Sequence, residues 1–185
     1  MIDVNELRKG TTFTMDGELY KVLTYQHHKP GRGKATIRTS LRNLRTGAII
    51  QHNFISGNRV EDIRIDKNVM EYLYNDGDFY YFMDVQTYEQ IAMPAPVMAE
   101  AAPFLKDNEK IEIKFYEGEP IDVSLPITVE LEVVETELAV AGDTATGATK
   151  QVVLETGLKI AAPLFVNVGD VIRVDTRKSS YITRV

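Results

Sequence analysis

The sequence predicts an all-β protein that consists of three small β-barrels in tandem. Short runs rich in Val, Ile, Tyr, Phe and Thr recur along the chain, and turn residues separate them at the spacing typical of small barrels or sandwiches. A charged stretch over 60–67 and a stretch over 120–127 with two prolines interrupt these runs, and proline is excluded from central strands. We therefore expect barrels over residues 1–64, 65–126 and 127–185.

Three of the expected strands directly follow a turn that contains glycine; they cover 19–23, 79–83 and 170–174. The Asp-Gly pairs at 16–17 and 76–77 supply the positive φ that a tight hairpin needs. These pairs predict a hairpin turn before each of the first two strands.

Helical segments are few. We expect one helical turn over 86–91 and a short amphipathic helix over 97–105, which Pro103 interrupts. A later strand over 129–135 alternates apolar residues with glutamates, which indicates a solvated strand face rather than paired carboxylates for catalysis. The glutamates are Glu130, Glu132, Glu135 and Glu137.

Charge is unevenly distributed along the chain. The 42 residues from Leu19 to Val60 contain eight Lys or Arg residues and no Asp or Glu. The three expected barrels carry net charges of +5, −9 and −2, although the whole chain carries −6. A local basic surface on an acidic protein indicates a polyanionic partner that is met at one place, because the remaining surface would repel it.

The composition indicates a folded, cytoplasmic protein. The chain has 185 residues, of which 44% are apolar, and it has no Cys. It can therefore form real cores without disulfides or thiolate metal sites. No apolar run approaches the ~20 residues of a membrane span, and no signal peptide is recognisable. We expect a monomer in a reducing compartment with no membrane partner.

The centre of the acid-free stretch predicts a basic β-hairpin. Pro30 fixes φ at the start of the tip. Gly31 and Gly33 allow backbone conformations that other residues avoid, so Arg32 is held out on a slim backbone. Along the following strand, alternation places three cations on one face: Lys34, Arg38 and Arg42. The simpler interpretation is an ordinary hairpin whose arginine is solvated.

No catalytic or cofactor site emerges from the motifs. The Gly31–Lys34 run lacks P-loop spacing, since Ala35 stands where a magnesium-binding hydroxyl is needed. His27 and His28 are adjacent and would point to opposite faces of a strand, so without Cys or nearby carboxylates they make a poor metal site. His52 has no Ser or carboxylate at the spacing of a nucleophilic relay. We expect no catalytic residue, no cofactor and no metal.

Four separated motifs resemble, in the same order, those of the bacterial translation elongation factor P family. The similarity covers the whole chain, and four motifs in register are far more specific than one glycine-rich loop. The motifs are KPGRGKA at 29–35, YLYNDG at 72–77, FMD and TYEQ within 82–90, and PLFV and GDVIRVDTR within 163–177.

Resemblance to this family implies an N-terminal KOW-like barrel followed by two OB-type barrels, in an L-shaped arrangement that mimics tRNA in shape and charge. It implies a non-enzymatic factor that binds the ribosome beside the peptidyl-tRNA, stimulates peptide-bond formation and relieves stalling at consecutive prolines. The loop would reach the CCA end of the tRNA, with Arg38 and Arg42 on its phosphates. The loop residues are Lys29, Pro30, Gly31, Arg32, Gly33 and Lys34.

The resemblance implies two further roles. In a subset of the family the tip arginine receives a rhamnose from a dedicated glycosyltransferase, whereas other members act unmodified, so modification of Arg32 is a hypothesis. Gly142, Asp143 and Thr144 match a family loop that approaches the exit-site codon and the small subunit. From composition alone, the surrounding segment 139–149 is an exposed connector.

Three other interpretations stay open. One is an elongation-factor-P-like paralogue, although the intact Pro-Gly-Arg-Gly tip favours the factor itself. Another is a general RNA- or single-strand-binding KOW/OB module. Such platforms combine aromatics with Lys or Arg, whereas Tyr80, Tyr81 and Phe82 have an acidic context. The last is a small hydrolase with an unrecognised site.

Overall fold

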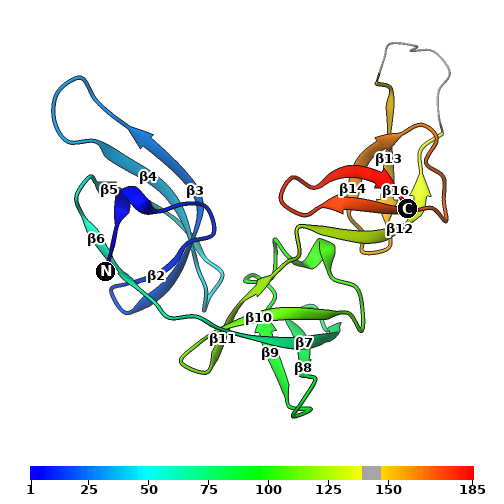
Figure 1. The fold of residues 1–185 in the computed structure, drawn as a ribbon, viewed down its shortest axis with the longest axis horizontal. Coiled ribbons are helices and arrows are strands. Elements are labelled where there is room, and N and C mark those ends of the chain that lie inside the picture. Colours follow the sequence, from blue (N-terminus) through cyan, green and yellow to red (C-terminus); the bar gives the residue numbers. More distant parts are fainter. Residues whose placement is uncertain (139–146) are drawn as a thin grey trace. The chain divides into compact units, whose positions relative to one another are not determined.

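The structure is a computed structural model that describes residues 1–138 and 147–185. It confirms the all-β fold class, because three β-sheets follow one another along the chain (Figure 1). The described residues form two compact units, Met1–Ala99 with Lys110–Val123 and Glu100–Glu109 with Ser124–Val185. The barrel boundaries at 64 and 126 stay a prediction. No helix among the described residues is long and apolar enough to cross a membrane.

The N-terminal sheet has six strands in the order β1-β6-β2-β3-β4-β5. Asp16 and Gly17 link β2 to β3 with φ of 54° and 79°, which confirms the predicted hairpin turn. Inward-facing side chains form the core, among them Phe13, Ile37 and Phe54. The elements are β1 (Ile2–Asp3), the 3-10 helix η1 (Val4–Glu6), β2 (Thr12–Met15), β3 (Glu18–His28), β4 (Thr36–Asn43), β5 (Ile49–Ile55) and β6 (Arg59–Asp62).

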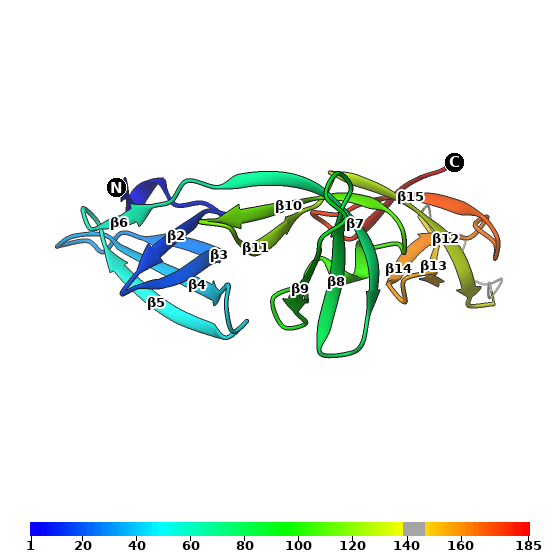
Figure 2. The same cartoon turned by 90° about the horizontal axis from the view of Figure 1, so that it is seen from below.

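The middle sheet has five strands in the order β11-β10-β7-β8-β9, and Figure 2 shows its β7–β8 hairpin along its length. The predicted strand over 79–83 is confirmed as part of β8, and it follows a turn in which Gly77 has a φ of 95°. The strands are β7 (Asp66–Asn75), β8 (Phe79–Asp84), β9 (Gln90–Pro94), β10 (Lys110–Tyr116) and β11 (Glu119–Ser124).

The amphipathic helix expected over 97–105 is wrong. This segment holds turns and the three-residue 3-10 helix η2 (Ala102–Phe104). Pro103 has no N–H to continue a helical ladder. Before it, the N–H groups of Val97 and Met98 donate to the backbone oxygens of Pro94 and Ala95, and these hydrogen bonds close turns. The turn expected over 86–91 is likewise short, because β9 begins at Gln90. The apolar spacing therefore reflects burial of a turn rather than a helix.

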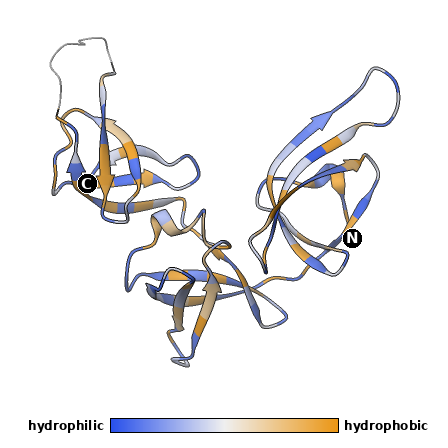
Figure 3. Cartoon of the chain, turned by 180° about the vertical axis from the view of Figure 1, so that it is seen from behind, coloured by the Kyte–Doolittle hydropathy of each residue, from blue (hydrophilic) through white to orange (hydrophobic). Residues whose placement is uncertain are grey.

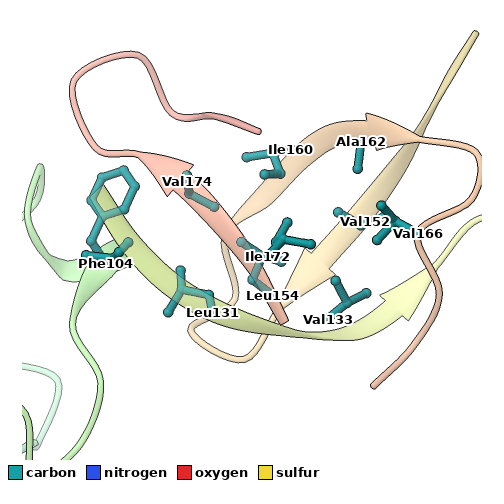
Figure 4. Close-up of a cluster of buried hydrophobic side chains, with 11 residues drawn as sticks. Phe104, Leu131, Val133, Val152, Leu154, Ile160, Ala162, Val166, Ile172 and Val174 are labelled. Atoms are coloured by element: carbon teal, nitrogen blue, oxygen red, sulfur yellow. The ribbon is translucent and has the colours of Figure 1, made fainter. Parts of the chain in front are cut away.

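The C-terminal sheet has five strands in the order β14-β13-β12-β15-β16. The predicted strand over 170–174 is confirmed as β15 apart from its first residue. Phe104 of η2 packs into the core of this sheet (Figure 4), so the segment 100–109 is part of the same compact unit. The strands are β12 (Thr128–Thr136), β13 (Thr149–Leu154), β14 (Lys159–Pro163), β15 (Val171–Asp175) and β16 (Ser180–Arg184).

Strand β12 confirms the predicted solvated face. Glu130 and Glu132 are exposed, whereas the residues between and beside them are buried: Val129, Leu131 and Val133. A register shift between Val133 and Glu135 ends this alternation. Hydrophobic and hydrophilic residues alternate in the same way along other strands (Figure 3). Glu130 and Glu132 are therefore part of a solvated strand surface.

Two ion pairs join the N-terminal sheet to the middle sheet within one compact unit. Lys21 Nζ of β3 lies 2.6 Å from Asp122 Oδ2 of β11, and the Asp122 side chain is only 6% exposed. Arg45 Nε, in the turn after β4, lies 3.3 Å from Glu119 Oε1 near the surface. An exposed ion pair contributes little to stability, whereas loss of one partner from a buried pair leaves an unpaired buried charge. The Lys21–Asp122 pair is therefore the stronger constraint on how β3 meets β11.

Gly47 offers a direct test of this junction. It has a φ of 76°, and a Cβ added there would clash with Cβ of Pro96, which follows β9 of the middle sheet. Gly47→Ala should lower the free energy of unfolding in urea by about 2–4 kcal/mol, because backbone strain and overpacking add. Gly57→Ala is the matched control: its φ is 93°, nothing lies within 4 Å of its Cβ position, and only about 1–2 kcal/mol should be lost. Equal losses would contradict a close contact at Pro96.

Candidate nucleic-acid interface

The acid-free stretch forms a hairpin of β3 and β4. The two strands pair from Tyr20 and Asn43 out to His28 and Thr36, and residues 29–35 close the turn. Figure 1 shows the hairpin extending away from the rest of its sheet. Strand β5 pairs with the other edge of β4, so the outer end of the hairpin is a three-stranded surface.

The middle of the hairpin is held to the N-terminal core. Tyr25 of β3 packs against that core, and its hydroxyl donates to the backbone oxygen of Asn5 at 3.4 Å. The Arg8 guanidinium lies over the Tyr25 ring, 5.4 Å from its centroid. At the far end, Ser56 N donates to Ala35 O at 2.8 Å, which ties the loop to the end of β5. The strands are thus positioned by packing and hydrogen bonds.

The tip carries the predicted arginine on an exposed backbone. Residues 31–34 are exposed, and no hydrogen bond or ion pair links Arg32 to another residue in the described part of the chain. Gly33 has a φ of 102°, a conformation that favours glycine. Gly31 does not adopt a positive φ, so it does not use the conformational freedom that glycine allows there. Nothing lies within 4 Å of a Cβ added at either glycine, and the tip is therefore slim on both sides of Arg32.

Arg38 lies at the centre of an exposed polar row. The register places it opposite Gln26 of β3 and Asn53 of β5, and all three residues are exposed. Lys34 is also exposed, but it belongs to the loop rather than to β4. Sequence reasoning missed Gln26 and Asn53, because cross-strand neighbours depend on the pairing register, including the shift between Val22 and Thr24. Amide side chains beside a guanidinium can donate hydrogen bonds to phosphate and ribose oxygens.

Arg42 corrects the expected row of three exposed cations. It is 8% exposed and therefore buried. The register pairs it with Lys21, and Lys21 in turn forms the ion pair with Asp122 of β11. The middle sheet thus covers this end of the strand face. We conclude that the exposed part of the predicted basic face consists of Lys34 and Arg38.

The cations of the acid-free stretch divide into two groups. Near the middle sheet, Lys21 and Arg45 each form an ion pair with a carboxylate of β11. On the outer hairpin, the exposed cations form no ion pair within residues 1–138 and 147–185: Lys29, Arg32, Lys34 and Arg38. Their charge is available to an external anion, because no local carboxylate neutralises it.

The structure describes only some of the other predicted positions. Gly142, Asp143 and Thr144 lie outside the described residues. His27 and His28 are exposed at the end of β3. Among the described residues, no group of three or more His, Asp or Glu side chains is placed to hold a metal ion.

Family models match almost the whole chain. The model described as Elongation factor P (EF-P) KOW-like domain matches residues 3–60, and the Elongation factor P (EF-P) OB domain matches residues 65–123. The model described as Elongation factor P, C-terminal, matches residues 129–184. These three matches follow the order of the three sheets.

Full-length relatives carry the same description. A protein named Elongation factor P from Moorella thermoacetica is 50% identical over 184 residues, and one from Caldanaerobacter subterraneus is 48% identical over 185; each alignment covers 100% of both chains. A solved structure titled Eukaryotic translation initiation factor 5A from Methanococcus jannaschii gives a TM-score of 0.46 at 25% identity, over 66% of this chain and 90% of that chain. The family assignment does not depend on this last likeness.

The two loop glycines should respond differently to substitution. Gly33→Ala places a side chain at a φ of 102°, so we expect the free energy of unfolding in urea to fall by about 1 kcal/mol. Gly31→Ala meets neither strain nor contact and should change it by less than about 0.5 kcal/mol. If Gly31→Ala were as costly as Gly33→Ala, the described loop conformation would be wrong.

Proposed function

Since the chain belongs to the elongation factor P family, we propose that this translation elongation factor binds the ribosome beside the peptidyl-tRNA and stimulates peptide-bond formation. In this proposal it relieves stalling at consecutive prolines, with Arg32 near the CCA end of the tRNA. The loop that matches the family motif supports this role, because its cations have no partner within the described chain.

In this proposal the factor accelerates peptide-bond formation by positioning the tRNA and not by acid–base chemistry. Proline is a constrained secondary amine and a poor partner in peptide transfer, so holding the peptidyl-tRNA in a productive orientation accelerates the step. A guanidinium stays protonated and cannot act as a general base. Arg32 would therefore bind phosphate or carbonyl oxygens and stabilise negative charge. The slim tip supports this role, since no neighbouring side chain at 31 or 33 obstructs its approach.

The rest of the hairpin binds the tRNA backbone in this proposal. We assign phosphate contacts to Lys29, Lys34 and Arg38, and add Gln26 and Asn53 as hydrogen-bonding neighbours of Arg38. Arg42 is excluded from this set by its burial. The segment with Gly142, Asp143 and Thr144 is proposed to approach the exit-site codon and the small subunit, on the strength of its match to the family loop alone.

A general single-strand-binding module fits the hairpin less well. Such proteins stack bases on aromatic rings that lie among cations. The two tyrosines of the hairpin, Tyr20 and Tyr25, both pack against the N-terminal core, and Arg8 lies over the Tyr25 ring. The exposed rings of the middle sheet lie in an acidic segment. Tight binding of free single-stranded RNA would nevertheless favour that function over the proposed one.

The central test replaces the tip arginine. Arg32→Ala should leave folding unchanged, because the side chain is exposed and forms no hydrogen bond or ion pair within the described residues. It should nevertheless abolish rescue of a polyproline reporter in reconstituted translation. Arg59→Ala is the matched control, since Arg59 is an exposed arginine of the same sheet outside the hairpin. Full rescue by Arg32→Ala would refute the proposal.

Modification of Arg32 is tested separately. The intact mass of the wild-type protein from its native host, measured by mass spectrometry, shows whether a rhamnose has been added to Arg32.

Salt dependence tests the grip on phosphate. Removing one phosphate contact should make the slope of log affinity against log salt shallower by about 0.7–0.9, so Arg38→Ala should weaken ribosome binding most at low salt. Arg59→Ala should leave the slope unchanged. Parallel slopes for wild type and Arg38→Ala in ribosome co-sedimentation would count against contact between Arg38 and phosphate.

A further inference from the structure

A second part of the chain is acidic, in contrast to the basic β3–β4 hairpin. The 38 residues from Asn68 to Leu105 contain no Lys, Arg or His and six Asp or Glu. They include β7, β8 and β9, which are neighbours in the middle sheet. Apart from Lys67 near the start of β7, which pairs with Glu112 of β10, these three strands therefore carry no cation.

The β7–β8 hairpin exposes a stack of aromatic rings. Tyr74 and Tyr81 face each other in the register, with ring centroids 4.7 Å apart and an interplanar angle of 25°. Phe79 lies two residues before Tyr81 on the same strand face, and the centroids of these two rings are 6.5 Å apart. Tyr74 is 52% exposed and Phe79 is 41% exposed. We call Tyr74, Phe79 and Tyr81 the outer aromatic face.

These rings are not needed to complete the core. The opposite face of the hairpin supplies the buried aromatics, Tyr72 and Phe82, which are 3% and 0% exposed. On the neighbouring strand β9, the residues beside Phe79 and Tyr81 are Pro94 and Ala92. Neither is large enough to cover an aromatic ring. The outer aromatic face is thus a surface of the sheet that the described chain leaves largely uncovered.

Carboxylates border this face and are held in place. Asp76 accepts hydrogen bonds from Phe79 N at 2.8 Å and from the Tyr81 hydroxyl at 2.7 Å. These bonds lower the pKa of Asp76, so it stays ionised at neutral pH. Asp78 adds a second exposed carboxylate in the same turn. Anionic groups beside aromatic faces attract a cation by two mechanisms at once.

We propose that the outer aromatic face, together with Asp76 and Asp78, binds an arginine-rich segment of a protein partner. Arginine fits better than lysine, because its planar guanidinium stacks on tyrosine rings and pairs with carboxylate oxygens in a fork. A nucleic acid is disfavoured, because its phosphates would meet carboxylates and no cation.

The chain itself uses this contact elsewhere. Arg8 lies over Tyr25, and Arg184 lies over Phe165 at 5.3 Å from the ring centroid. The outer aromatic face has no such arginine among the described residues of the chain, so the equivalent cation must come from outside. This inference is independent of the Arg32 loop, which lies on another sheet, and either proposal can fail alone.

The test uses the full chain and a labelled peptide of alternating arginine and glycine. Fluorescence anisotropy should show binding that Tyr74→Ala, Phe79→Ala and Asp78→Asn each weaken about fivefold. Two matched controls should change affinity less than twofold: Phe165→Ala, an exposed ring that already has its own arginine, and Asp107→Asn, an exposed carboxylate just beyond the 68–105 stretch. Arg32→Ala should have no effect.

Several outcomes would overturn the proposal. Amide NMR shifts on peptide addition should concentrate within 74–82 and 90–94, and shifts spread over the acidic surface would show non-specific attraction. Equal binding of a lysine-glycine peptide would remove the case for arginine. Binding of a uridine-rich RNA at the same amides would identify a nucleic-acid site instead. Unchanged thermal midpoints of the three variants ensure that lost binding is not lost folding.

Discussion

The pairing register of β3, β4 and β5 is the constraint on which the candidate interface depends. It turns Ile37, Thr39 and Leu41 into the core and Arg38 outward. A slip of one residue would exchange these faces and bury a charge. The same outward face is divided along its length: its outer end is exposed, whereas its inner end meets β11 through Lys21. One strand face thus joins two sheets and presents a basic surface.

That division explains how an acidic protein keeps a usable basic surface. Cations near the middle sheet are neutralised by carboxylates of β11, so they contribute to cohesion rather than to recognition. Cations on the hairpin have no carboxylate within the 42-residue stretch. The 38-residue stretch around β8 is the reverse case, with carboxylates and no cation. Segregation of charge by segment gives the chain two surfaces of opposite charge.

The errors of sequence interpretation have identifiable physical causes. Apolar spacing over 97–105 suggested a helix, but Phe104 instead packs into the C-terminal core from a 3-10 turn. Both loop glycines allow a conformation that other residues avoid, but only Gly33 adopts it. Alternation placed Arg42 on the correct face of β4 but could not show that another sheet covers it. The local pattern determines to which face of a strand each side chain points. It carries no information about what packs over that face.

The all-β class, the hairpin turns, the acid-free stretch and the tip around Arg32 follow from residue order alone, because they depend on period-two alternation, turn chemistry and local charge. Resemblance across four motifs was enough to identify the family. The tertiary structure decided which cations are free, which amides flank Arg38 and which tyrosines remain uncovered. Those properties arise from contacts between residues far apart in the chain, such as Lys21 with Asp122, and no local pattern specifies them.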